Sequence, residues 1–378
     1  MFSFKLLSAV LIILLCLMIS LPSGVVAQAK VGGSSANFLH LSNSARAVGM
    51  GGCAVLLVDE QAPLFNPGSL GLFYLDKKYG VSFPNSTNLK ADFLQDARLK
   101  SFSTGIRLTS SKINSSVRLC FAASYSQQIY RGYIIRVDYT NPVGIDSGDV
   151  EYLAFQDEVR MITASFGLEA SFFRLGIGLT GKYIEEELEN EPADGTAFDI
   201  GCNLEVSVPQ FMDMVSGRRT GDFYRNNFIL SLTAVRSHMG ASMEFINEKF
   251  PLPTTTILGS SLYYTYSRGG KTVFSARSSG ELMRYSSEWS HRAGVEAGVL
   301  DVAFLRLGKA EGVDDMSWGF GVSLVESLRR LNVLKCPNNS KSDFWSELAE
   351  NLDINFDYAN SDDNGWYDTK YWQIRLSL

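Results

Sequence analysis

Apolar and polar residues alternate along most of the chain from about residue 79 onward. Between residues 117 and 125, for example, Val117, Leu119 and Phe121 alternate with Arg118 and Cys120. A period of two is typical of β-strands, because successive side chains point to opposite faces of the strand. The same pattern recurs at residues 162–170, 175–183, 198–206, 228–235, 258–266, 292–299, 318–324, 352–358 and 372–378. The chain is therefore predicted to be all-β.

Two all-β architectures compete. In a soluble sandwich the apolar faces form a core, whereas in an outer-membrane barrel they meet lipid and the small or polar faces line the lumen. The polar faces here are rich in Gly, Ser, Thr and Asn, and strands of about ten residues match a tilted crossing of a bilayer. Aromatic residues near strand ends are expected to form interfacial girdles: Tyr130, Tyr133, Tyr139, Tyr263, Tyr264, Tyr266, Tyr371 and Trp372. A transmembrane barrel is favoured, and a soluble exported β-sandwich stays open.

The N-terminus has the features of a secretory signal peptide. Lys5 precedes an apolar run from Leu6 to Leu21, which Pro22 breaks, and small residues follow before Gln28. An N-terminal membrane anchor is the alternative. We expect residues 1–27 to be removed. No later stretch approaches the roughly 18 apolar residues of a spanning helix, so a membrane-embedded chain must pair its backbone in a closed barrel.

Composition and motifs exclude several functions. The net charge of −6 and the scattered basic residues argue against nucleic acid as a partner. The three histidines are isolated and offer no metal spacing. Residues 49–54 superficially match a dinucleotide fingerprint, but no strand precedes them and no strand–helix alternation follows. No nucleophile or zinc-protease motif occurs. The cysteines of the processed chain lack paired spacing and are expected to be mostly buried thiols: Cys53, Cys120, Cys202 and Cys336. We therefore predict no catalytic residue, cofactor or metal.

The segments between strands differ in character. Residues 142–150 are predicted to form a loop. Residues 209–227 and 238–253 carry charges and prolines, and each is predicted to be a loop with a short helix. Residues 325–334 and 342–352 have helical spacing. The acidic residues 185–191 are predicted to form a solvated hairpin tip.

The region before the first strand carries the most distinctive motif. A small-residue run, Ser44-Ala-Arg-Ala-Val-Gly-Met-Gly-Gly52, is followed by Asp59-Glu60 and then by Asn66-Pro-Gly-Ser-Leu70. This order resembles the PorV/PorQ group of outer-membrane proteins, relatives of the FadL-type transporters of hydrophobic compounds. The family typically has Ala-Gly where this chain has Gly68-Ser69, so small residues are retained. Further segments similar to the family lie at residues 178–184, 197–201, 292–296, 305–308 and 353–359.

The resemblance implies a barrel of about fourteen antiparallel strands with an N-terminal hatch inside the lumen. We accordingly assign residues 28–78 to the hatch and residues 79–378 to the transmembrane barrel. Glycines permit tight turns against a barrel wall, and Asn-Pro fixes a turn. The predicted hatch and gating residues are Gly49, Gly51, Gly52, Asn66 and Pro67. An ordinary surface turn is the alternative for this motif.

The last residues alternate up to the end of the chain. Trp372, Ile374, Leu376 and Leu378 share one face, as in the terminal strand that barrel-assembly machinery recognises. Leu378 departs from the usual aromatic final residue, and an ordinary closing strand explains the alternation equally well.

The resemblance implies a non-enzymatic protein of the cell outer membrane, in contact with lipid. The leading function is support of protein export or surface delivery of the type IX secretion kind, with cargo proteins or secretion components as partners. The alternative is FadL-like passage of a hydrophobic small molecule, with the hatch as gate. A purely structural barrel is a third hypothesis.

Overall fold

The computed structural model describes the chain from residue 34 to residue 378 with several gaps. The described ranges are 34–91, 94–114, 117–137, 150–188, 191–211, 226–245, 248–285, 288–313, 315–330, 352–361 and 369–378. The predicted signal peptide, Cys336 and nearly all of the predicted segments 142–150, 209–227 and 342–352 lie outside them.

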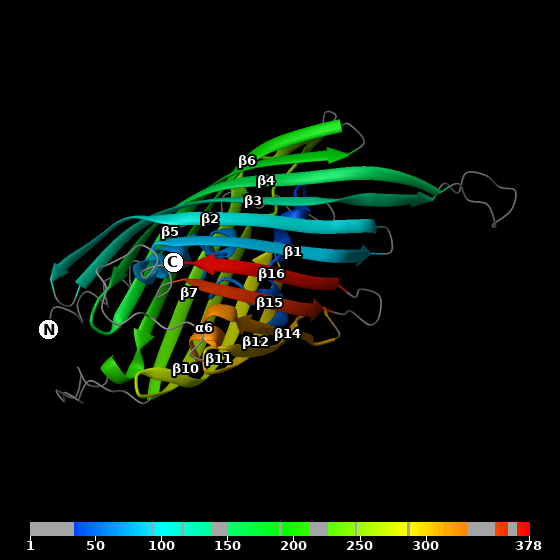
Figure 1. Ribbon diagram of the computed structural model, residues 1–378. Helices are drawn as coiled ribbons and strands as arrows, with labels where there is room; N and C mark the ends of the chain where they lie inside the picture. The colour runs from blue at the N-terminus through cyan, green and yellow to red at the C-terminus, as the bar shows by residue number, and fades with distance from the viewer. Residues whose placement is uncertain are drawn as a thin grey trace, which may run out of the picture.

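Fourteen of the described strands form one closed antiparallel barrel (Figure 1). Each strand pairs with its neighbours in order, and β16 pairs with β1 to close the barrel, with Gly80 opposite Ser377. The strands are β1 Tyr79–Ala91, β2 Leu94–Asn114, β3 Val117–Val137, β4 Val150–Glu169, β5 Phe173–Leu188, β6 Glu191–Ser207, β7 Asn226–Gly240, β10 Thr255–Arg268, β11 Lys271–Tyr285, β12 Glu288–Val299, β13 Ala303–Ala310, β14 Ser317–Ser323, β15 Asp353–Ser361 and β16 Thr369–Ser377. The prediction of an all-β barrel of about fourteen strands is confirmed.

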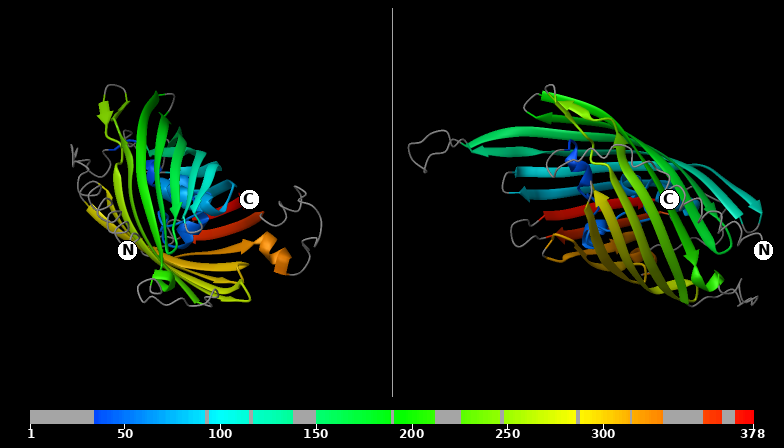
Figure 2. Two further views of the ribbon diagram at one scale, coloured as in Figure 1. Left: turned by 90° about the vertical axis from the view of Figure 1, so that its left-hand side faces the viewer. Right: turned by 180° about the vertical axis from the view of Figure 1, so that it is seen from behind.

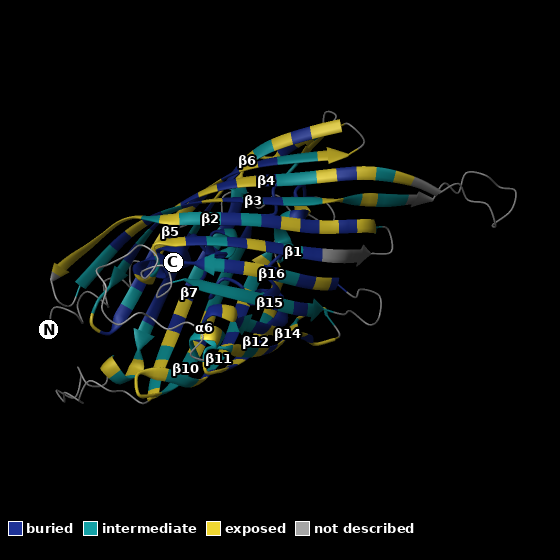
Figure 3. Ribbon diagram, viewed as in Figure 1, coloured by how far each residue is buried: buried dark blue, intermediate teal, exposed yellow. Residues whose placement is uncertain are grey.

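The apolar side chains of most of the barrel wall point outward. On β5, Ile177 is 40% exposed and Leu179 is 55% exposed, while Gly178 and Thr180 between them are buried inside. Figure 3 shows the same alternation of exposed and buried positions along the other strands. A soluble barrel would bury its apolar face in its core, so this arrangement is the one expected for a wall that faces lipid.

The N-terminal segment, residues 34–78, lies inside the barrel (Figures 1 and 2). It contains the short helices η1 Asn37–His40, α2 Ala45–Gly49 and α3 Ala62–Phe65, and the longer helix α4 Pro67–Asp76. We call this segment the hatch. The end of the barrel where β1 begins and β16 finishes is the near end, and the opposite end is the far end. The hatch runs from the far end, where Ser35 bonds to Pro251, to the near end, where Lys78 bonds to Leu378. None of the described helices is long and apolar enough to cross a membrane.

Several local predictions need correction. Tyr130, Tyr263 and Tyr371 turn into the barrel rather than joining an outer girdle, because they occupy the inward positions of their strands. Residues 238–253 contain a two-stranded hairpin, β8 Met243–Phe245 and β9 Glu248–Phe250, instead of a helix. The helix expected at residues 325–334 is present as α6, Leu324–Arg330.

Candidate functional site

Asn66 and Pro67 form the start of α4 at the centre of the lumen. The Asn66 side chain is fully buried; its Oδ1 accepts a hydrogen bond from the Gly68 N–H at 2.9 Å, which caps the helix. Its Nδ2 donates to the Val55 carbonyl at 2.9 Å and to Thr233 Oγ1 on β7 at 2.7 Å. Pro67 stands at the first helical position, where its missing N–H costs nothing. The predicted turn is therefore a buried helix cap that also joins the hatch to the wall.

Helix α4 packs backbone to backbone on β4, β5 and β6. A Cβ atom added at Gly176 would lie 2.0 Å from the Gly68 carbonyl oxygen, and one at Gly178 would lie 2.3 Å from the Pro67 carbonyl oxygen. At Gly167 it would lie 2.3 Å from the Gly71 carbonyl oxygen. Inward-facing glycines of the wall thus let the hatch approach as closely as a backbone can on this side.

The other predicted hatch glycines pack on the opposite wall. Gly51 has φ +68°, and a Cβ there would lie 2.3 Å from the Lys309 amide nitrogen of β13. Gly52 also has a positive φ, +86°. A Cβ at Gly49, at the end of α2, would lie 3.2 Å from Gly319 Cα on β14. The structure brings all five predicted residues into the lumen, and a role for them in gating stays a prediction.

Arg46 of α2 is held by carboxylates of both the hatch and the wall. Its guanidinium makes two contacts with the Glu296 carboxylate of β12, at 3.0 and 2.7 Å, and a third with Asp59 at 3.3 Å. Arg306 of β13 lies on the other side of Glu296 at 2.7 Å and reaches Asp357 of β15 at 2.7 Å. The three carboxylates that these two arginines join are buried, as is Arg306, whereas the Arg46 side chain is 15% exposed.

Arg375 of β16 completes this lumen charge network. Its guanidinium lies 2.9 Å from Asp357, 3.3 Å from Glu60 and 3.5 Å from Asp59. Burial raises the pKa of the Glu60 carboxyl, and the neighbouring Arg375 counteracts only part of this rise. The network joins three arginines to four carboxylates: Arg46, Arg306, Arg375, Asp59, Glu60, Glu296 and Asp357. It fastens the middle of the hatch to β12–β16, and removal of one member would leave an unpaired buried charge.

The far end of the hatch is attached through apolar contacts and hydrogen bonds. Phe38 lies in a cluster of inward-facing apolar residues: Ala36, Val159, Met161, Ile184, Ala193, Ala197, Met243 and Leu252. Hydrogen bonds also hold the segment. The Ala36 N–H donates to the Glu186 carboxylate at 2.8 Å, the Ser35 N–H donates to the Pro251 carbonyl at 3.1 Å, and the Ser35 hydroxyl lies 3.3 Å from the Phe250 carbonyl. The Ser34 hydroxyl contacts the Tyr285 hydroxyl of β11 at 2.5 Å. We call this part of the lumen the far-end chamber.

Sequence reasoning missed a polar cluster beside this chamber. His40 and His238, predicted to be isolated, lie with their ring centroids 5.8 Å apart. His238 sits at a register shift in β7, with φ +59°, and its Nδ1 lies 3.0 Å from Lys182 Nζ. Lys182 in turn pairs with Asp199 at 2.8 Å. Only barrel closure and the shifted register bring these groups together, so spacing along the chain carries no signal for them.

A small cavity of about 50 Å³ lies between the hatch and β7, β10, β11 and β12. Its apolar lining comes from Leu39, Leu41, Leu64, Phe65, Ile257 and Met283. His40 Nε2 and Ser42 Oγ face polar neighbours without a hydrogen-bond partner among the described atoms. Burial, together with the nearby positive charges of Arg292 and Lys182, lowers the pKa of His40 to about 4, so its imidazole is neutral at neutral pH.

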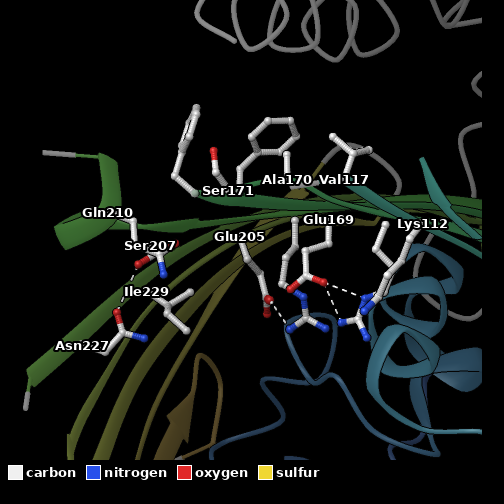
Figure 4. Close-up of a pocket in the computed structure, with 14 residues that line it drawn as sticks. Lys112, Val117, Glu169, Ala170, Ser171, Glu205, Ser207, Gln210, Asn227 and Ile229 are labelled. Carbon is white, nitrogen blue, oxygen red and sulfur yellow. Dashed lines mark hydrogen bonds and ion pairs between the residues drawn. The ribbon is translucent and has the colours of Figure 1, made fainter. Parts of the chain in front are cut away.

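A second pocket, of about 540 Å³, opens at the near end (Figure 4). Arg118 contacts Glu169 at 2.6 Å, and Arg174 contacts Glu205 at 3.2 Å. Both arginines also bind Asp76, the last residue of α4, at 2.8 and 2.7 Å. The positive and negative side chains at this pocket are therefore paired with one another, and these ion pairs fasten the near end of the hatch to β3 and β5.

Two further groups of predicted residues have defined places. Trp372, Ile374 and Leu376 lie on the outward face of β16, alternating with the buried positions Tyr371, Gln373 and Arg375, and Leu378 follows the last residue of the strand. Cys53 and Cys120 are buried and Cys202 is partly buried, each as a free thiol. Within the described part of the chain, no three His, Cys, Asp or Glu residues come together as a metal site would require.

Comparison with known proteins locates similar barrels among solved structures. No protein-family model matches the chain, and no curated protein matches it significantly. A FadL homologue from Pseudomonas aeruginosa is 11% identical, with 89% of this chain and 98% of that one covered and a TM-score of 0.39. The toluene transporter TbuX of Ralstonia pickettii is 11% identical, with 90% and 97% covered and a TM-score of 0.45. The transport unit of the Escherichia coli autotransporter AIDA-I is 9% identical, with 79% and 89% covered and a TM-score of 0.38. These likenesses concern the fold alone, which the closed order of fourteen strands establishes for this chain.

Proposed function

We propose that this protein is a non-catalytic outer-membrane barrel that admits small hydrophobic molecules, with its hatch as the gate. The observation that carries the proposal is a lumen closed by the hatch whose far-end chamber is apolar. The outward apolar wall supports residence in a lipid bilayer. On this proposal residues 1–27 are the signal peptide, residues 28–78 the hatch and residues 79–378 the barrel.

The chamber fits an apolar solute better than a polar one. Phe38, Val159 and Ile184 bring buried apolar surface to the chamber. The adjoining cavity is lined by apolar side chains such as Phe65 together with polar ones such as Glu281. Transfer of an apolar molecule from water to such a surface is favourable, and a few polar groups suffice to orient it. Glycine-to-backbone packing and the lumen charge network hold the rest of the hatch, whereas hydrogen bonds and apolar contacts hold the far-end segment, residues 34–42. This segment is the part that we expect to move.

Surface delivery of exported proteins, implied by the PorV/PorQ resemblance, is the second candidate. The ordered motif from Ser44 to Leu70 favours it, since this motif forms the buried centre of the hatch. A deletion strain distinguishes the two functions. Loss of apolar-solute uptake with unchanged surface display of secreted proteins supports the transporter, and the opposite result supports delivery.

A reversible crosslink tests the gate directly. The backbones of Ser35 and Pro251 are hydrogen-bonded at 3.1 Å, the closeness that a disulfide requires. In liposomes that contain the Ser35→Cys, Pro251→Cys variant, oxidation is expected to reduce influx of radiolabelled toluene to the level of protein-free liposomes, and reduction to restore it. The two single-cysteine variants serve as controls. Undiminished influx through the oxidised double variant would refute a gate at the far end.

A further inference from the structure

The chemistry of the barrel wall changes along β2–β6 toward the far end. On β4, the outward residues are apolar in the part closer to the near end, at Ile162 and Phe166, and charged toward the far end, at Glu158 and Arg160. The inward residues change in the opposite sense at the same level, from small polar side chains such as Thr163 to apolar ones such as Val159 and Phe155. Lipid favours an apolar exterior and water a polar one. This level therefore marks where the wall leaves the apolar layer, an inference that rests on the membrane location proposed above.

Three basic side chains gather on the outer face of the wall at this level. Arg98 and Lys100 of β2 and Arg131 of β3 are exposed. The first two flank the buried Leu99, and the neighbours of Arg131 in the strand are partly buried. We call these three residues the rim patch. Arg98 and Arg131 are direct neighbours across the two strands. Like charges placed opposite each other destabilise a sheet unless another group compensates them.

No acidic side chain of the described chain neutralises the rim patch. None of its three residues takes part in an ion pair or side-chain hydrogen bond with the described residues. Arg160, on the adjoining strand β4, provides the contrast, because it contacts Glu158 at 2.5 Å and Glu185 at 3.0 Å. Among the described residues, one outward arginine at this level is paired, and its basic neighbours on β2 and β3 are left open to an external anion.

The surroundings of the rim patch specify the kind of anion. Phe83 and Phe102, whose ring centroids lie 5.4 Å apart, cover the outer face next to Lys100 on the side of the apolar wall. Tyr133, 44% exposed, follows Arg131 on the same face. Aromatic side chains beside a row of basic ones are typical of the interface between acyl chains and headgroups. An anion held here would carry acyl chains that continue along the aromatic pair.

We propose that the rim patch binds the phosphate of a lipid headgroup in the leaflet at the far end. Neighbouring antiparallel strands hold paired residues about 5 Å apart, so two guanidinium groups can converge on one phosphate. Lys100 adds a point charge on the side nearest the apolar wall. Bound phosphate removes the repulsion between Arg98 and Arg131 and fixes the height of the barrel in the bilayer.

Retention of lipid by the purified protein tests this site. The full-length barrel is reconstituted in nanodiscs of phosphatidylcholine with or without phosphatidic acid, and retained lipids are counted by native mass spectrometry. The wild type is expected to prefer phosphatidic acid, and the preference should fall roughly five-fold for each basic residue removed, equivalent to about 1 kcal/mol each. The variants are Lys100→Gln and the triple change Arg98→Gln, Lys100→Gln, Arg131→Gln.

Lys249→Gln is the matched control, because Lys249 is exposed at the far end on the β8–β9 hairpin, outside the rim patch. It should leave the preference unchanged. Equal retention of phosphatidic acid by wild type and triple variant would overturn the site. Heat-modifiable migration of each sample reports insertion separately. A wild type that fails to insert contradicts the proposed membrane location, whereas an inserted wild type without a preference contradicts the lipid site alone.

Discussion

Replacement of Asn66 by alanine removes four hydrogen bonds from the centre of the hatch, the longest of them to the Cys202 carbonyl at 3.4 Å. The cap on Gly68 contributes about 1 kcal/mol, and each of the two bonds to Val55 and Thr233 contributes about 1 kcal/mol net. In this variant the Val55 carbonyl still accepts a hydrogen bond from the Ser69 hydroxyl at 3.3 Å, and the Thr233 hydroxyl still donates one to the Cys202 carbonyl at 2.6 Å. Both groups therefore keep one hydrogen-bond partner. We expect Asn66→Ala to lower the free energy of unfolding by about 3 kcal/mol.

The loss should appear in the hatch before it appears in the barrel. The wall strands keep their ladder hydrogen bonds in this variant, while α4 loses its cap and its link to β7. Hydrogen exchange of the Gly68 and Ser69 amides in detergent-solubilised protein, compared with urea unfolding of the whole barrel, measures the two effects separately. Exchange should accelerate at these amides with little change in the β1–β16 seam.

Asn66→Asp separates the cap from the donated bonds. The aspartate retains an oxygen for the Gly68 amide but places a carboxyl opposite the Val55 carbonyl, where only its protonated form can donate. Its folded-state pKa should therefore be raised, so its stabilising contribution is present in acid and is lost as pH rises through that pKa. Wild-type exchange rates in Asn66→Ala, or an Asn66→Asp variant with the same pH dependence as Asn66→Ala, would refute the assigned bonding.

Three other predictions follow from the lumen. Gly176→Ala places a Cβ 2.0 Å from the Gly68 carbonyl oxygen and should destabilise the protein by about 1–3 kcal/mol in urea unfolding. The control Gly181→Ala, with no atom within 4 Å of the new Cβ, should be neutral. Equal effects of the two substitutions would contradict the close packing of α4. Arg306→Met leaves Glu296 and Asp357 short of a partner and should cost about 3–5 kcal/mol, and a change below 1 kcal/mol would show that the network is hydrated. Because the pKa of His40 is lowered from 6.5 to about 4 in the folded state, the unfolded chain binds the proton first as pH falls. The stability that neutral His40 contributes is thus present above pH 6.5 and is lost as the pH falls toward 4. Over this range the wild type should lose about 3 kcal/mol of unfolding free energy relative to His40→Gln. Parallel curves of stability against pH for the two proteins would refute this.

The strands and the orientation of their faces follow from the sequence because side-chain direction alternates locally. The outward places of Ile177, Leu179 and Phe121, and of Trp372 and Ile374 at the end of the chain, can be read from the period of two. The motif around Asn66 indicated a hatch through its resemblance to a family. The tyrosine girdle was partly mispredicted because position near a strand end does not determine the face, and beyond the apolar layer the inward face becomes the apolar one.

Only the tertiary structure decided how hatch and wall meet. Arg46 and Glu296 are 250 residues apart, and Asn66 and Thr233 are 167 apart, so their contacts depend on closure of the barrel and on the register of every strand between them. The pairing of His40 with His238 depends in addition on one shifted residue in β7. Alternation depends on neighbouring residues and can be recognised in the sequence. The contacts inside the lumen depend on the register of all the strands that separate the contacting residues, and no local sequence pattern determines that register.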